Sequence, residues 1–311
     1  MQKLLTGLQP SGALHLGNYF GALKPFLDLY QEYESTLLVV DYHALTTLKN
    51  PEDLRASIVS VVKDYLALGV DPKRVTIAQQ SSVPEHTELA WVFETLVSVP
   101  FLMQAHAYKD KVAKGFEANA GLFNYPMLMA SDILLYDTDV VPVGADQRQH
   151  VEYAREAAAK FNSAYGATFK EPKERVLKSA GVVPGTDGEK MSKSYGNTIP
   201  LFGSKDAIQK AVMSIVTDSE GDKPKNVYAI HTLFKTEGEL EGLYSGNVGK
   251  YKALKEVLTE DIDAYFSSAR ERRESISDGD VVTVLKEGSE KARARASAKM
   301  ADVRKKIGVT I

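Results

Sequence analysis

The sequence has no cysteine among its 311 residues, so it can form neither disulfides nor thiolate metal sites. It also lacks any apolar run near the roughly 20 residues that a membrane-spanning helix needs. The first three residues lead directly into an expected strand, which leaves no room for a signal peptide. With 44% hydrophobic and 25% charged residues, the composition is that of an ordinary globular protein. We therefore expect a cytoplasmic enzyme that does not enter a membrane.

Two common phosphate-binding motifs are missing as well. Neither GxGxxG nor GxxxxGK[ST] occurs, which removes the main support for a dinucleotide-binding or P-loop protein. The formal net charge of −3 argues against general affinity for nucleic acids, although it allows a local basic patch.

A different phosphate-binding pattern stands near the start of the chain. Residues 3–8 are apolar enough for a buried strand, and a helical pattern opens at Tyr19. Between them lies a Gly/Pro/Ser turn, residues 10–18, called here the first signature segment. Free N–H groups at such a helix start attract anions, and His15 and Asn18 add side-chain donors. Alone, the segment is equally consistent with an ordinary helix start that carries a histidine.

Residues 190–194, Lys-Met-Ser-Lys-Ser, form the second signature segment and follow a loop rich in Gly, Pro and Asp. Two lysines three residues apart on a loop are suited to binding a polyphosphate, because lysine is a compact charge on a flexible stem. A chance lysine-rich loop could imitate this pattern. Its occurrence after the first signature segment makes chance a weak explanation.

The order of elements predicts an α/β fold. Strand candidates at residues 36–41, 75–78 and 139–143 alternate with helical patterns, which indicates a doubly wound parallel sheet. Ligands of such sheets bind at the carboxyl ends of the strands. The first signature segment and residues 41–43 both follow strand ends, so we expect them to share a pocket.

One helical segment, residues 123–136, carries an isolated acid. Tyr125, Met129, Asp132 and Tyr136 recur at helical steps and share one face. A carboxylate on an apolar face is costly unless it meets a donor, which could be water or a ligand N–H group. Trp91, the single tryptophan, is expected to pack rather than to function.

The second half of the chain reads as helical. We expect helices at residues 205–216, 226–234, 251–266 and 289–307. The last contains seven basic and two acidic residues, a pattern that fits a solvated face or an RNA-facing surface. We expect a catalytic domain with a helical insertion at residues 1–188 and a helical domain at 189–311, the last helix packing back on the former.

Together these motifs resemble the bacterial-type tryptophanyl-tRNA synthetases over essentially the whole chain. Residues 15–18 resemble the HIGH motif of class I synthetases, and residues 190–194 match KMSKS without a substitution. Residues 9–12, 41–44, 125–136 and 141–147 add further matches. The resemblance implies a Rossmann-like sheet with a C-terminal anticodon-binding helical domain. It also implies a homodimer that uses ATP to convert L-tryptophan to tryptophanyl-AMP, then charges tRNA(Trp).

The resemblance also assigns residues, always by their place in the matching motifs. The implied catalytic residues are His15, Asn18, Lys111, Lys190 and Lys193. The implied ATP-binding residues are Gln9, Pro10, Ser11, Gly17, Asn18, Gly144, Ala145, Asp146, Val176, Lys190, Met191, Ser192, Lys193 and Ser194. The implied tryptophan-binding residues are Asp132, Tyr125, Met129, Ile133, Val141, Val143, Gln147 and His43. Mg²⁺ accompanies the nucleotide, with no dedicated metal site in the protein.

Three departures and three alternatives accompany this assignment. His15-Leu16 replaces a common Thr-Ile, Leu5 stands where an aromatic often stacks on the indole, and the loop before Lys190 is long. The alternatives are a tyrosyl-tRNA synthetase, a non-catalytic paralogue that binds tryptophan or RNA, and a small-molecule adenylyltransferase. For the homodimer, the apolar helices near residues 91–99 and 122–135 are the expected contact surfaces.

Overall fold

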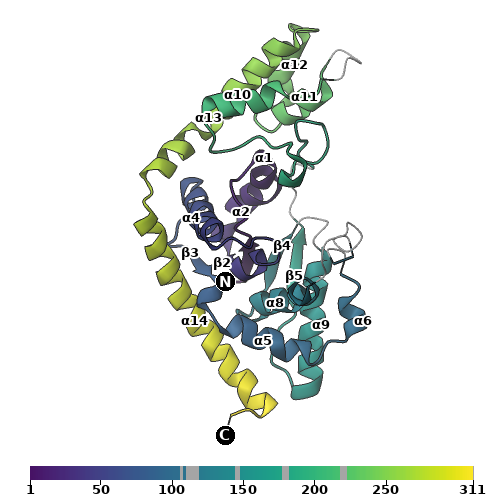
Figure 1. The fold of residues 1–311 in the computed structure, drawn as a ribbon, viewed down its shortest axis with the longest axis vertical. Coiled ribbons are helices and arrows are strands. Elements are labelled where there is room, and N and C mark those ends of the chain that lie inside the picture. The colour runs from purple at the N-terminus through teal and green to yellow at the C-terminus, as the bar shows by residue number, and fades with distance from the viewer. Residues whose placement is uncertain (106–107, 110–118, 144–147, 177–181, 218–222, 311) are drawn as a thin grey trace.

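The computed structural model describes residues 1–105, 108–109, 119–143, 148–176, 182–217 and 223–310 (Figure 1). Its centre is a five-stranded sheet in the order β3-β2-β1-β4-β5, with every pair parallel. The strands are β1 (Lys3–Leu8), β2 (Glu34–Val39), β3 (Val75–Gln79), β4 (Val140–Val143) and β5 (Lys173–Val176). The strand order reverses between β1 and β4, and the crevice at such a reversal is where doubly wound sheets bind ligands. The predicted fold class is confirmed.

Both faces of the sheet are covered, which explains why its strands read as continuous apolar runs. Successive residues of a strand point to opposite faces, so Leu4 enters one hydrophobic core and Leu5 the other. The first core is built on α1 (Leu16–Asn18), α2 (Lys24–Leu29) and α4 (Pro51–Ala67). The second is built on α5 (Glu85–Glu94), α8 (Ala120–Leu134) and α9 (Arg148–Tyr165).

Short helices complete this half of the molecule. A π-helical turn at Tyr19–Leu23 joins α1 to α2, α3 (Asp41–Ala44) follows β2, and α6 (Val99–Leu102) follows α5. Two expectations fail here. Trp91 on α5 is 68% exposed and does not pack in the core, whereas α8 is buried against α5 and α9 and offers little free surface.

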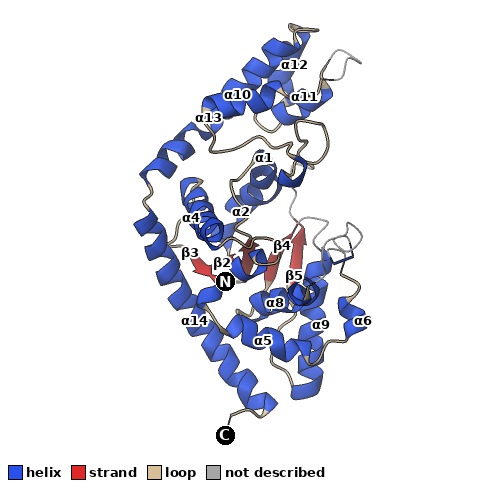
Figure 2. Ribbon diagram, viewed as in Figure 1, coloured by secondary structure: helices blue, strands red, loops and turns tan. Residues whose placement is uncertain are grey.

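In its described part, the C-terminal half is built of helices joined by loops (Figure 2). It contains α10 (Lys205–Met213), α11 (Lys225–His231), α12 (Glu237–Ser245), α13 (Tyr251–Ser275) and α14 (Asp278–Ile307). Helix α12 was not predicted, and α14 begins eleven residues earlier than expected. The first core extends into this half through Leu254, Ile262 and Phe266 of α13, so both halves share one apolar interior. Among the described residues, no helix is long and apolar enough to cross a membrane.

Helix α14 runs along the edge strand β3 (Figure 1). The helix approaches the strand so closely that a Cβ on Gly288 would lie 1.9 Å from the carbonyl oxygen of Ile77. The next residue, Ser289, accepts a hydrogen bond from the backbone N–H of Gln79 at 3.0 Å. The helix thereby covers a sheet edge that would otherwise present unpaired backbone groups.

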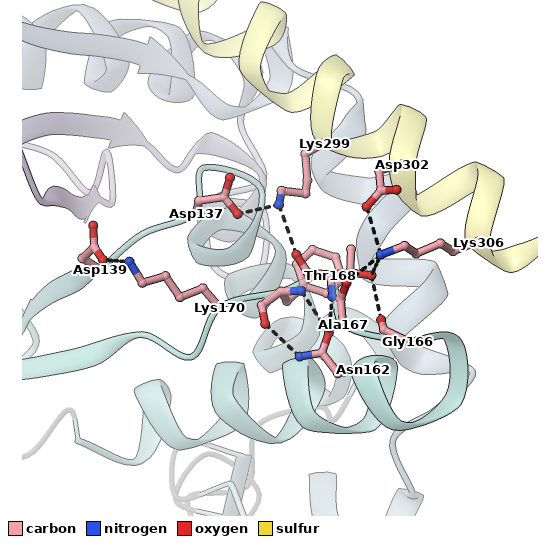
Figure 3. A network of polar contacts seen from close by, with 11 residues as sticks. Asp137, Asp139, Asn162, Gly166, Ala167, Thr168, Lys170, Lys299, Asp302 and Lys306 are labelled. Carbon is pink, nitrogen blue, oxygen red and sulfur yellow. Dashed lines mark hydrogen bonds and ion pairs between the residues drawn. The ribbon is translucent and has the colours of Figure 1, made fainter.

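The basic residues of α14 dock onto the catalytic half. Arg295 pairs with Glu34 at 2.6 Å, and Lys299 pairs with Asp137 at 2.5 Å. Lys306 donates to the Ala167 carbonyl at 2.6 Å, in the polar network that ties α14 to the loop before β5 (Figure 3). These three cations are therefore engaged within the chain, whereas Lys291, Arg293 and Lys305 of the same helix are exposed. For the exposed residues, a solvated or RNA-facing surface stays a prediction.

Candidate active site

The two signature segments lie against each other. Lys193 donates a hydrogen bond to the Ser11 carbonyl at 2.9 Å, and the backbone N–H of Gly17 points at the Met191 sulfur at 3.3 Å. Just beyond the second segment, the chain pairs with the first: Leu16 N–H donates to Ile199 O and Leu201 N–H to Leu14 O. Segments some 170 residues apart in sequence are thus joined by backbone hydrogen bonds.

Gly17 is required by this close approach. A Cβ at this position would stand 3.0 Å from the His15 ring and 3.2 Å from Met191 Cβ. Met191 is itself 4% exposed and fixed in the core. A side chain at position 17 would therefore push the two segments apart.

His15 stands at the N-cap of α1 in a buried, neutral state. Its side chain is 6% exposed, and its backbone N–H donates to Asn18 Oδ1 at 3.2 Å. Burial, aided by the charge of Lys193, lowers the pKa of His15 to about 4. Its Nδ1 atom is buried without a hydrogen-bond partner in the structure. An orphaned ring nitrogen beside two phosphate-binding motifs is positioned to receive a ligand.

Asn197 organises the second signature segment, and the sequence reasoning missed it. Its side-chain amide donates to Asp187 Oδ1 at 2.8 Å and to Lys190 O at 3.1 Å, and its oxygen accepts from Ser192 N–H at 2.8 Å. It is 2% exposed. Gly196 before it has φ +66°, a conformation that favours glycine. The Gly-Asn pair one residue after the motif was the available signal.

An apolar cavity of about 390 Å³ opens at the carboxyl ends of β1 and β4. Its lining includes seven of the residues expected to bind tryptophan: His43, Tyr125, Met129, Asp132, Ile133, Val141 and Val143. Leu5 also lines it, together with Leu38 and Val40, which were not predicted. Gln9 lines this cavity and also a second one of about 470 Å³ beside Pro10, Ser11 and Gly12. Gln9, the residue just before the first signature segment, therefore borders both spaces.

Among the described residues, Asp132 is the one carboxylate in the lining of the apolar cavity. It is 3% exposed, and Gln80 Nε2 donates to both of its oxygens at 2.8 and 2.9 Å. His43 Nε2 lies 2.9 Å from Oδ2, and His86 Nδ1 lies 2.7 Å from Oδ1. Burial acts to raise the pKa of Asp132, but His86 and His43 outweigh it and lower the pKa. Asp132 is therefore an ionised acceptor.

Several expected residues cannot be placed. Lys111, Gly144, Ala145, Asp146 and Gln147 lie outside the described residues. Val176 ends β5, at the same edge of the sheet as the cavity, but its side chain is not described. Within the described part of the chain, no cluster of three His, Asp or Glu side chains is arranged to bind a metal ion.

Comparison with known proteins agrees with this geometry. The family model of class I tRNA synthetases for tryptophan and tyrosine matches residues 1–290. A tryptophan–tRNA ligase from Fusobacterium nucleatum is 47% identical over 321 aligned positions, which cover 99% of this chain and 98% of that protein. The chain belongs to the bacterial tryptophanyl-tRNA synthetases. A ligase from Rhodopirellula baltica is 43% identical over 99% of both chains.

Solved structures of this family superpose closely on the enzyme. The tryptophanyl-tRNA synthetase of Campylobacter jejuni complexed with ADP and tryptophan has a TM-score of 0.92 and 42% identity, covering 99% of this chain and 100% of that one. A tyrosyl-tRNA synthetase from Archaeoglobus fulgidus, at 20% identity and a TM-score of 0.66, shares the fold alone.

The buried His15 predicts a specific pH dependence. Its pKa falls from 6.5 to about 4 on folding, so the unfolded chain binds more protons between these values. The neutral, buried His15 therefore contributes fully to the free energy of unfolding above pH 6.5. As the pH falls toward 4, this contribution is lost, which lowers the free energy of unfolding by about 3 kcal/mol at most. Urea unfolding of the wild type and His15→Gln at pH 7 and pH 4.5 should show a steeper loss for the wild type. Equal losses would contradict a buried, neutral His15.

Proposed function

We propose that the apolar cavity and the two signature segments are the two halves of one active site. The enzyme uses ATP to convert L-tryptophan to tryptophanyl-AMP and pyrophosphate, and then transfers the tryptophanyl group to tRNA(Trp), releasing AMP. The observation that carries the assignment of the site is the ionised Asp132 in an apolar cavity at the strand-order reversal, joined to the first signature segment by Gln9.

In the amino-acid half, the indole ring occupies the apolar cavity. Tyr125, Met129, Ile133, Val141 and Val143 surround the ring, and Gln147 is assigned to the same half by the resemblance. Asp132 accepts a hydrogen bond from the indole N–H, the one polar atom of the ring and a donor only. Tyrosine would also present an acceptor, but the donors around Asp132 are already directed at its own oxygens. The site therefore favours tryptophan over tyrosine.

In the nucleotide half, the task is to position ATP for in-line attack by the tryptophan carboxylate on the α-phosphorus. A carboxylate–phosphorus bond forms as the bond to pyrophosphate breaks, and negative charge shifts to the leaving group. Lys190, Lys193 and Lys111 stabilise that charge, while His15 and Asn18 donate to the phosphates. Lys193, now bonded to the Ser11 carbonyl, exchanges that acceptor for a phosphate oxygen.

The remaining nucleotide contacts follow the same assignment. Pro10, Ser11 and Gly17 contribute from the first signature segment, Gln9 from the position just before it, and Met191, Ser192 and Ser194 from the second segment. Gly144, Ala145 and Asp146 bind the ribose, and Val176 meets the adenine through its backbone. Mg²⁺ arrives bound to the nucleotide and supplies additional charge on the phosphates.

Two single substitutions test the amino-acid half and the nucleotide half of the site separately. Both are assayed by tryptophan-dependent pyrophosphate exchange. Asp132→Asn should lower kcat/KM for tryptophan on the order of 10- to 100-fold and narrow the preference over phenylalanine, because it weakens a charged acceptor. Lys193→Ala should lower kcat on the order of 10²-fold while tryptophan binding persists, because its charge acts in the transition state. The control is Lys210→Ala, an exposed lysine on α10. An unchanged tryptophan-to-phenylalanine ratio in Asp132→Asn would refute its role.

The enzyme also acts as a homodimer in the cytoplasm, where its tRNA substrate is charged. Three large apolar side chains gather around α5 and α6: Trp91 is 68%, Val99 58% and Met103 52% exposed. Such side chains are costly to leave in water, so this surface is the proposed subunit contact. The helical region from residue 189 onward, apart from α14, supplies the anticodon-binding domain.

The dimer predicts a defined sedimentation behaviour. At micromolar concentration the protein should sediment at twice its chain mass of 34.1 kDa, and Trp91→Glu should shift it toward the monomer. The exposed Tyr195→Glu serves as a surface control. A wild-type monomer would exclude the dimer, and a Trp91→Glu protein that stays dimeric would exclude this surface.

A further inference from the structure

Behind Asp132, on the side away from the cavity, lie two buried side chains that no role above explains. His86, at the start of α5, is 0% exposed, and Tyr136, just after α8, is 3% exposed. His86 Nδ1 lies 2.7 Å from Asp132 Oδ1, and His86 Nε2 lies 2.8 Å from the Tyr136 hydroxyl. Neither residue is part of the cavity lining. The three side chains form a line that runs from the core to the ligand cavity.

The Tyr136 hydroxyl holds the His86 ring in place. Burial, together with the negative charges of Asp132 and Glu85, raises the pKa of Tyr136, so the phenol keeps its proton. Asp132 is ionised and can only accept. The His86 ring spans the two groups, with Nδ1 2.7 Å from Asp132 Oδ1 and Nε2 hydrogen-bonded to the Tyr136 hydroxyl at 2.8 Å, so the hydroxyl fixes the orientation of the ring.

These contacts limit what Asp132 can still accept. A carboxylate offers about four acceptor positions. Gln80 bridges both oxygens, His43 approaches Oδ2 and His86 approaches Oδ1. Gln80 and His86 hold the carboxylate from the core side, whereas His43 approaches Oδ2 from the cavity lining, so an indole N–H would take the position at Oδ2 that His43 now occupies.

We propose that Tyr136, acting through the orientation of the His86 ring, is a positioning residue that gives the site its selectivity for the indole N–H. Without the Tyr136 hydroxyl, the His86 ring loses its hydrogen bond at Nε2 and gains freedom to turn. The contact of Nδ1 with the carboxylate is then lost, and the carboxylate turns away from the ligand. This inference rests on the proposed role of Asp132, which the test below examines separately.

The test compares tryptophan with its isostere β-(3-benzothienyl)alanine, in which sulfur replaces the indole N–H. Pyrophosphate exchange is measured with both substrates for the wild type and Tyr136→Phe. The variant should raise KM for tryptophan about 5- to 10-fold, the effect of one hydrogen bond. KM for the isostere, KM for ATP and kcat should stay near wild-type values, so the preference for tryptophan narrows. Equal changes with both substrates would show that the hydroxyl only shapes the cavity, and would overturn the proposal.

Two further variants sharpen the result. Tyr153→Phe is the matched control, because Tyr153 is buried in the same core and its hydroxyl has no partner in the structure. The ratio of KM for the isostere to KM for tryptophan should be the same in this variant as in the wild type. His86→Asn keeps a donor near the Nδ1 position without needing Tyr136. In that background, Tyr136→Phe should have no further effect on the ratio. A full additional effect there would show that the hydroxyl does not act through His86.

Asp132→Asn, assayed with the same two substrates, separates the proposal about Tyr136 from the proposal that Asp132 binds the indole N–H. If Asp132→Asn narrows the ratio but Tyr136→Phe leaves it unchanged, Asp132 reads the indole and the inference about Tyr136 is wrong. If Asp132→Asn also leaves the ratio unchanged, the proposed role of Asp132 fails, and the inference fails with it.

Discussion

The active site depends on one close backbone approach, the contact of the Gly17 N–H with the Met191 sulfur. Two flanking hydrogen bonds, Leu16 N–H to Ile199 O and Leu201 N–H to Leu14 O, extend this contact into a short ladder. The ladder places a lysine-bearing loop over a strand-turn-helix unit whose own N–H groups favour anions. Neither segment alone could surround a triphosphate. The two segments therefore meet at a position where any side chain larger than that of glycine would press on the His15 ring and on Met191.

A second constraint attaches the helical half to that junction. Arg273 of α13 pairs at 2.5 Å with Asp64, a 1% exposed carboxylate on α4, and also donates to Ser60. The buried Asp64 in turn interacts electrostatically with Lys193 of the second signature segment. Asp64 thus stands between Arg273 of the helical half and Lys193 of the second signature segment. From the other end, α14 crosses the sheet edge and ties down the loop that leads into β5.

The sequence predicted the sheet, the two signature segments and the isolated Asp132, because each depends on local pattern: strand hydrophobicity, a glycine-rich turn, one acid on an apolar face. It did not predict what tertiary packing decides. Helix α12 buries only Leu240 and Tyr244 and contains two glycines, so its periodicity is weak. Gln80 and His86 are buried polar groups whose partner, Asp132, is distant in sequence. The cations of α14 likewise pair with acids that are distant in sequence, such as Glu34 and Asp137, so these ion pairs could not be predicted from the helix alone.

The most direct test of the account is to fill the junction. Gly17→Ala adds a methyl group 3.0 Å from the His15 ring and 3.2 Å from Met191 Cβ, whereas a Cβ at Gly21, in the π-helical turn that follows α1, meets nothing within 4 Å. If the junction positions the phosphate-binding groups, Gly17→Ala should reduce kcat for pyrophosphate exchange at least tenfold, with tryptophan binding preserved, and Gly21→Ala should not. Equal activity of two folded variants would contradict the account.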